Sequence, residues 1–276
     1  MSTGIQWKDA VAIVTGASSG IGLAVARAMV ARGARVALVA RTKATLERVA
    51  RDLGADRAES FPLDVTDHAG LAALPGRVVA RFGRLDVLVN NAGVNHRGGV
   101  CERTGDELAS ILDTNLVAPV LLTRAALEHL GAGGAVVNVA SLAGKVPVPH
   151  EATYSASKAG LRAFSRALGI ELGARGVHVA VVNPGPVDTG FFGDVATVPD
   201  LVFSQPMSTA EQVADGVMAA IDGRLTEVDV PSVSGKLATL GYLSPRFFAA
   251  LRPVLEKRGA KNKATYMARR KTRDEI

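Results

Sequence analysis

The sequence has few of the residues that mark secreted, membrane-spanning or metal-binding proteins. Its single cysteine, Cys101, excludes a disulfide within the chain and favours a reducing compartment. No apolar run approaches the roughly 18 residues of a membrane span, and the opening MSTGIQWKDA lacks a basic-then-apolar signal pattern. The five histidines have no metal-ligand spacing, so we expect no metal site and a cytoplasmic location.

Charge of one sign is also scarce over most of the chain. The formal net charge is +6, but residues 246–276 alone carry ten Lys/Arg against three acids, which leaves the other residues near neutrality. The high isoelectric point therefore belongs to the C-terminal tail. It gives no reason to expect a nucleic-acid partner for the body.

What the sequence does have is an alternation of short apolar runs with longer helical patterns. The runs are rich in β-branched residues and apolar almost throughout, as in strands buried on both faces of a parallel sheet. Strands are predicted at 10–14, 35–40, 59–63, 86–90, 134–140, 177–183 and 226–230. Helices are predicted between them, at 20–32, 42–53, 67–82, 105–130, 153–174 and 209–222. This order predicts an α/β fold: a doubly wound parallel sheet of about seven strands with helices on both faces.

No Pro/Gly/Ser-rich linker interrupts residues 1–235. We therefore expect one catalytic domain over 1–243, with a substrate lid at about 188–210, followed by a separate segment at 244–276. Residues 245–258 have apolar side chains at helical spacing, interrupted by Pro253, and predict a short helix. The strongly basic stretch at 260–276 is predicted to be mobile, either as a solvated end or as a weak contact with anionic lipid.

A glycine-rich turn follows the first predicted strand and opens the first helix. Glycines here allow a tight turn and a close approach of the backbone to a pyrophosphate, which the helix N-terminus also favours. The predicted dinucleotide-binding residues are Gly16, Ser18, Ser19, Gly20, Ile21 and Gly22. The same letters spell the G-x-S-x-G elbow of α/β-hydrolases, but only 15 residues precede Gly16, too few for the strands that such a fold needs there.

The end of the second predicted strand indicates which dinucleotide binds. A site for NAD usually has an acid there, whereas this sequence reads Ala40-Arg41-Thr42. Arg41 can pair with a 2′-phosphate, so NADP(H) is favoured over NAD(H). The alternative is that Arg41 is a solvated residue at the start of the next helix.

Tyr154 is one of three tyrosines, and Lys158 follows it by four residues in a predicted helix. This spacing puts both side chains on one helical face, where the ammonium would lower the pKa of the phenol. From the residues alone, the pair is either a tuned proton donor or a surface contact.

Taken together, these motifs resemble the classical short-chain dehydrogenase/reductase (SDR) family over about residues 8–231. The marks, in order, are Thr15–Gly22, Asp64-Val65, Asn90-Asn91-Ala92-Gly93, Asn115, Ser141, Tyr154 with Lys158, and Pro184-Gly185 followed by Thr189. The resemblance implies a Rossmann-type fold, and an enzyme that interconverts a carbonyl and an alcohol with a nicotinamide cofactor. It also implies a homodimer or homotetramer.

The resemblance further implies a role for each marked residue. Asn115, Ser141, Tyr154 and Lys158 would form a catalytic tetrad. Tyr154 would be the general acid/base, Lys158 would lower its pKa and bind the ribose, Ser141 would stabilise the oxyanion, and Asn115 would anchor a relay water. The cofactor would also contact Asp64, Val65, Asn91, Ala92, Gly93, Pro184, Gly185, Val187 and Thr189.

Two other functions stay open: a dinucleotide-binding sensor or scaffold without turnover, and an epimerase or dehydratase on the related fold. For the substrate, residues 191–207 follow Thr189 and are distinctly apolar. A lipophilic small-molecule ketone or aldehyde is the hypothesis. The alternative is a lid whose apolar side chains only pack on the body.

Overall fold

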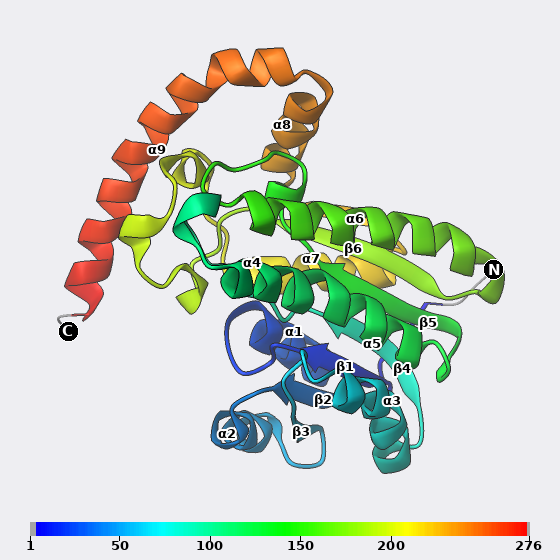
Figure 1. Cartoon of the computed structure of the whole chain (residues 1–276). Coiled ribbons are helices and arrows are strands. Elements are labelled where there is room, and N and C mark those ends of the chain that lie inside the picture. Colours follow the sequence, from blue (N-terminus) through cyan, green and yellow to red (C-terminus); the bar gives the residue numbers. More distant parts are fainter. Residues whose placement is uncertain (1–3, 275–276) are drawn as a thin grey trace.

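The computed structural model describes residues 4–274 and contains one parallel sheet between two layers of helices (Figure 1). The strands are β1 (Val11–Thr15), β2 (Arg35–Ala40), β3 (Ala58–Pro62), β4 (Leu85–Asn90), β5 (Leu130–Val139), β6 (His178–Pro184) and β7 (Glu227–Val230). Their order in the sheet is β3-β2-β1-β4-β5-β6-β7. The doubly wound fold predicted from the sequence is confirmed.

Helices cover both faces of the sheet, which explains the continuous apolar strands. One face packs against α1 (Gly20–Ala31), α2 (Lys43–Leu53) and α7 (Ala210–Asp222). The other face packs against α3 (His68–Phe82), α5 (Ala118–Ala126) and α6 (Ala152–Leu172). Strands β1 and β6 are buried at every position, as sheet interiors between two helix layers require.

The helix predicted at 105–130 is shorter than expected and contains a π turn. It consists of α4 (Gly105–Leu112), a π turn at Asp113–Val117 and α5, and β5 already begins at Leu130. By length and composition this helix, Gly105–Ala126, is apolar enough to cross a membrane, contrary to our reading of the runs. Ala118, Leu122 and Ala126 nevertheless pack into the core, so it is a core helix here.

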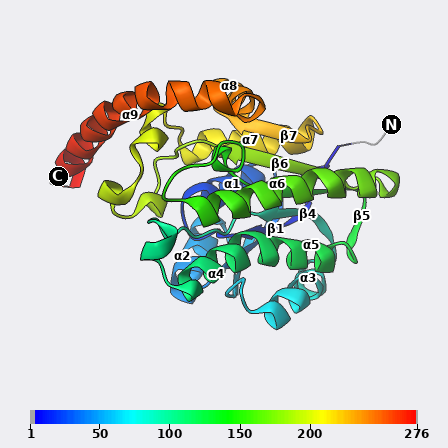
Figure 2. The ribbon, with the colours of Figure 1, turned by 45° about the horizontal axis from the view of Figure 1, so that its top comes forward.

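The predicted C-terminal segment is wrong in two respects. Residues Ser232–Leu243 form a helix, α8, that was not predicted, and α9 runs over Pro245–Asp274 instead of ending near 258. Of the residues expected to be mobile, 260–274 form the second half of α9 and lie along the lid, as both ribbon views show (Figures 1 and 2), and 275–276 lie outside the described residues. Pro253 removes one backbone hydrogen bond without ending the helix.

The predicted lid is a chain of short 3-10 turns between β6 and α7. They span Gly190–Phe192, Val195–Thr197 and Asp200–Ser204. Four lid side chains form a small apolar cluster of their own, namely Phe192, Val195, Val198 and Phe203. Tyr266 of α9 packs against this cluster. Part of the apolar character of the lid therefore serves packing, as the alternative reading held.

Candidate active site

A cleft of about 770 Å³ lies at the carboxyl ends of the strands. Its floor includes the space where β1 and β4 diverge into opposite crossovers, the usual binding place in an open α/β sheet. Of the residues predicted for the site, all but Gly22 and Asn115 line this cleft. Those two lie just behind its wall.

The turn after β1 fits a pyrophosphate. Gly16 and Gly20 have positive φ angles of 66° and 53°, which other residues rarely adopt. A Cβ at Gly22 would overlap the carbonyl oxygen of Gly16, so the helix can approach the turn only with glycine there. Ser19 caps α1 without a side-chain hydrogen bond, and the first turn of α1 has no acidic residue. The first amides of α1 are thus open to an anion.

The loop after β4 is held against the turn by Thr15. Its hydroxyl accepts hydrogen bonds from the backbone amides of Asn91 (2.9 Å) and Ala92 (3.0 Å). The Asn91 side chain donates in return to the carbonyl oxygen of Thr15 at 2.9 Å. These bonds join the ends of β1 and β4 and place Gly93 beside Lys158 of α6.

Arg41 lies at the other end of the cleft and makes no hydrogen bond or ion pair within residues 4–274. The nearby Asp64 accepts bonds from the amide and hydroxyl of Thr66, at 3.0 and 2.8 Å. The backbone bond is the main reason that its pKa is lowered, and Arg41 contributes. Asp67, next to them, caps α3 through Gly70. Asp64 and Val65 therefore face the cleft while Asp67 only serves the helix.

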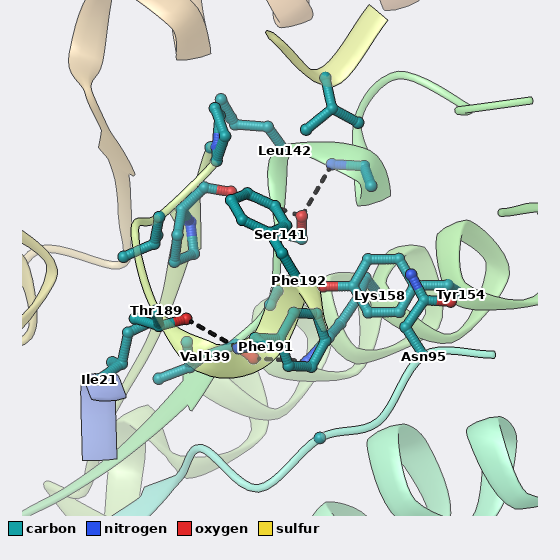
Figure 3. A pocket seen from close by; sticks show the side chains of 18 of the residues that line it. Ile21, Asn95, Val139, Ser141, Leu142, Tyr154, Lys158, Thr189, Phe191 and Phe192 are labelled. Atoms are coloured by element: carbon teal, nitrogen blue, oxygen red, sulfur yellow. Dashed lines mark hydrogen bonds between the residues drawn. The ribbon is translucent and has the colours of Figure 1, made fainter. Parts of the chain in front are cut away.

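Tyr154 and Lys158 point from one face of α6 into the cleft (Figure 3). The lysine Nζ lies 5.8 Å from the centre of the tyrosine ring and donates to the carbonyl oxygen of Val139 at 2.9 Å. Ser141, just beyond β5, lies within hydrogen-bond reach of the phenol and lowers its pKa slightly. The three side chains come from two elements and surround one small volume.

The expected lowering of the tyrosine pKa is not found in the protein alone. Burial, with the negative Glu151 next in importance, raises the pKa of Tyr154 to about 12. Burial also lowers the pKa of Lys158 to about 8. Desolvation opposes the charged form of both groups and here outweighs the attraction between them.

Asn115 lies in the π turn between α4 and α5 and is fully buried. Its amide nitrogen donates to the carbonyl oxygen of Val94 (2.9 Å) and to the Ser157 hydroxyl (3.2 Å), and its oxygen accepts from the amide of Val94 (2.8 Å). Both amide protons are used, so the side chain positions the loop and cannot donate to a water. A π turn leaves backbone carbonyls out of the regular ladder, and such turns are frequent at functional sites.

The sequence analysis missed a group of polar side chains beside Tyr154. Arg97 and Glu151 form a buried ion pair of 2.8 Å, and Arg97 also donates to the carbonyl oxygen of Phe192 in the lid. Asn95, whose side chain bonds to Glu151, also lines the cleft, and the buried amide oxygen of Gln205 lines it without a hydrogen-bond partner in the described part of the chain. No local pattern marks these residues, because the fold alone brings them to the cleft.

It also missed the outer wall of the cleft. α8 contributes Val233, Leu237 and Ala238, and α9 contributes Phe248, Leu255 and Arg258. The helical spacing of apolar side chains over 245–258 was visible in the sequence. What it packs against was not.

Known proteins of one family resemble this chain. The family model described as short chain dehydrogenase matches residues 10–198. The protein named as the ketoacyl reductase of the monensin polyketide synthase of Streptomyces virginiae is 39% identical over 252 residues, covering 89% of each chain. Ketoacyl reductase HetN of Nostoc sp. is 37% identical over 245 residues, covering 84% of each.

Among solved structures, a short chain dehydrogenase from Burkholderia cenocepacia in complex with NADP matches with a TM-score of 0.76 and 32% identity. The match covers 82% of this chain and 97% of that one. The fold and the cleft define an oxidoreductase of the dinucleotide-binding α/β class. The chain belongs to the short-chain dehydrogenase/reductase family.

Proposed function

We propose that the protein is an NADP(H)-dependent reductase that interconverts a lipophilic ketone or aldehyde with its alcohol. The observation that carries this proposal is the convergence of Tyr154, Lys158 and Ser141 beside an uncapped, glycine-rich helix N-terminus in one cleft. The relatives named as ketoacyl reductases support a ketoacyl compound as one substrate to test.

Each group of cleft residues has a separate task in this proposal. The bound cofactor supplies the hydride, and the turn after β1 and Arg41 hold its phosphates. Tyr154 gives its phenol proton to the carbonyl oxygen. Ser141 donates a hydrogen bond to the same oxygen as negative charge builds there.

Lys158 has two tasks in this proposal. Its ammonium lies beside the tyrosine and can bind a ribose hydroxyl, and it favours the phenolate once the proton has left. Because both amide protons of Asn115 are used, its side chain cannot donate to the relay water behind Lys158, and we assign that water to a backbone carbonyl of the π turn. That water would return a proton to Tyr154 through the lysine.

The substrate is proposed to be lipophilic because the side of the cleft beyond Tyr154 is mostly apolar. Phe191 lies with its ring centre 6.1 Å from that of Tyr154, and Leu142, Val148 and Leu201 continue the lining. The unpartnered amide oxygen of Gln205 favours a hydrogen-bond donor on the substrate near the carbonyl. An unpaired buried amide costs about 1–3 kcal/mol, which such a group would recover.

Tyr154→Phe tests this proposal directly. It removes the transferred proton with little change in volume, so NADPH oxidation with a panel of ketones and aldehydes should fall by about 10²–10⁴-fold. NADPH binding, followed by fluorescence, should stay within about twofold of wild type. Retained turnover would contradict the mechanism. Tight NADPH binding by a wild type that turns over no carbonyl compound would favour the sensor instead.

A further inference from the structure

α9 presents one continuous face to the body of the protein. Less exposed positions recur along it every three or four residues, at Phe248, Leu251, Leu255, Gly259, Lys263, Tyr266 and Arg270, with Glu256 beside Leu255 also partly buried. This is the period of a helix that packs along its whole length on one side. The first half of the face is apolar and lines the cleft, and the second half is polar and contacts the lid.

The second half of α9 clamps the lid through several independent bonds. Lys263 donates to the carbonyl oxygens of Ala196 (3.0 Å) and Val198 (2.6 Å) and pairs with Asp200 at 3.3 Å. The Tyr266 hydroxyl donates to the carboxylate of Asp188 at 2.6 Å, one residue before Thr189. These bonds tie all parts of the lid to one helix.

Glycine at position 259 makes this packing geometrically attainable. A Cβ there would overlap the carbonyl oxygen of Asp200, so α9 and the lid touch through their backbones. The rings of Tyr266 and Phe203 pack 5.6 Å apart just beyond this contact. The position of α9 is therefore closely determined, and the wall it forms is a defined surface.

Arg258 lies next to this contact and lines the cleft while remaining exposed to solvent. It makes no hydrogen bond or ion pair with any residue in the described range 4–274, and the nearby Asp200 is paired with Lys263. An apolar wall that ends in an uncompensated cation suits a substrate whose apolar chain ends in an anionic group.

We propose that α9 is a built-in part of the substrate site, which selects elongated carbonyl compounds whose apolar chain runs along Phe248 and Leu255 to an anionic group at Arg258. The clamp of α9 on the lid holds this wall in place. The family model ends at residue 198, before α8 and α9 begin. The inference rests on the proposed reductase function.

Neighbouring residues on α9 provide a matched test of the wall. Leu255 faces the cleft, whereas Val254 points to solvent and is 63% exposed. We would measure kcat/KM with NADPH for unbranched ketones of increasing chain length. Leu255→Ala should lower kcat/KM about tenfold for long chains and leave short ones unchanged, because only long chains reach this wall. Leu255→Trp should move the cut-off to shorter chains, and Val254→Ala and Val254→Trp should do neither.

The anionic end is tested with keto acids and ketones of equal length. Arg258→Gln should lower kcat/KM severalfold for the keto acid only, with a smaller effect at high salt, since an exposed pair is screened. Lys257→Gln, one position along and exposed, is the control. Equal behaviour of the two variants would remove the anion from the proposal.

Gly259→Ala tests the clamp of α9 on the lid. Gly105→Ala is the control, because a Cβ at that glycine would meet open space. Alanine normally favours a helix by about 1 kcal/mol, yet at 259 it should expose the lid to limited proteolysis and raise KM for long ketones. NADPH binding by all variants reports that they are folded.

The outcomes separate this inference from the function on which it rests. If Leu255 and Val254 variants have the same chain-length profile, α9 is no part of the substrate site and the inference is wrong while the reductase stands. If the wild type reduces no carbonyl compound of any length, the proposed function fails and the inference with it.

Discussion

Tyr154 and Lys158 have protonation states that suit reduction at neutral pH. Burial and Glu151 raise the pKa of Tyr154 to about 12, so the phenol stays protonated, as the proposed proton transfer requires. Burial lowers the pKa of Lys158 to about 8, so its charge is the first to be lost as the pH rises. The pH limit of the free enzyme should therefore come from the lysine.

We expect kcat/KM for NADPH in the reductive direction to be constant below about pH 8 and to fall above that pH. The ammonium exists below its pKa and disappears above it, and kcat/KM reports groups of the free enzyme. In Lys158→Met the remaining activity should lose this limb. A limb that persists in Lys158→Met would assign the titration to another group.

The proposed preference for NADP rests on Arg41. Arg41→Asp should raise the ratio of kcat/KM for NADH to that for NADPH by about 10²-fold, because a charge-assisted bond to the 2′-phosphate is replaced by repulsion. Arg48→Asp, on the exposed side of α2, is the control. A wild type that already prefers NADH would contradict the choice of NADP.

At the scale of elements, a buried charge cluster ties α6 to the edge of the sheet. Lys145, 5% exposed, lies 2.8 Å from both Glu227 and Asp229 of β7, and Arg162 of α6 bonds Glu227 from the other side. Burial alone would raise the pKa of Glu227, but hydrogen bonds from Arg162 and Lys145 outweigh it and bring the pKa to about 2. The cluster fixes the helix that carries Tyr154 and Lys158.

Lys145→Met should lower the free energy of unfolding by about 3 kcal/mol, because two half-buried carboxylates lose their shared cation. Chemical denaturation at neutral pH measures this. Lys43→Met breaks an exposed pair with Glu47 and should cost less than about 0.5 kcal/mol. Equal losses in the two variants would show that the cluster does not stabilise the fold.

Over the whole molecule, positive charge and exposed apolar side chains gather on the same helices. Tyr242, Leu243 and Val254 are at least 63% exposed on α8 and α9, and α9 carries most of the excess positive charge. These helices also border the cleft. We propose a weak contact with anionic lipid here, from which an amphipathic substrate could enter.

Wild type should sediment with vesicles of anionic lipid at low salt and be released at high salt, since each basic residue contributes about 1 kcal/mol. Reversing the exposed Lys257, Lys261 and Arg269 to glutamate should abolish sedimentation and leave turnover of a soluble ketone unchanged. The control carries the same reversals at Arg48, Arg51 and Arg77. If wild type stays in the supernatant, the lipid contact is discarded.

The sequence by itself determined the order of strands and helices and the glycine-rich turn. A strand buried between two helix layers needs a continuous apolar run, and a tight turn needs glycine. Both requirements act on neighbouring residues and are therefore visible in the sequence. The predicted site residues that follow strand ends lie in the cleft for the same reason, since parallel strands end at one edge of the sheet.

Only the tertiary structure decided what surrounds Tyr154 and where α9 lies. The raised tyrosine pKa comes from burial and from Glu151, which short-range spacing to Lys158 did not reveal. The basic tail was predicted to be mobile because it is rich in charged residues and poor in large apolar ones. Its helix is held instead by contacts such as Tyr266 with Asp188, 78 residues apart in the chain. Such contacts depend on where the fold places both residues, so the sequence around either residue does not predict them.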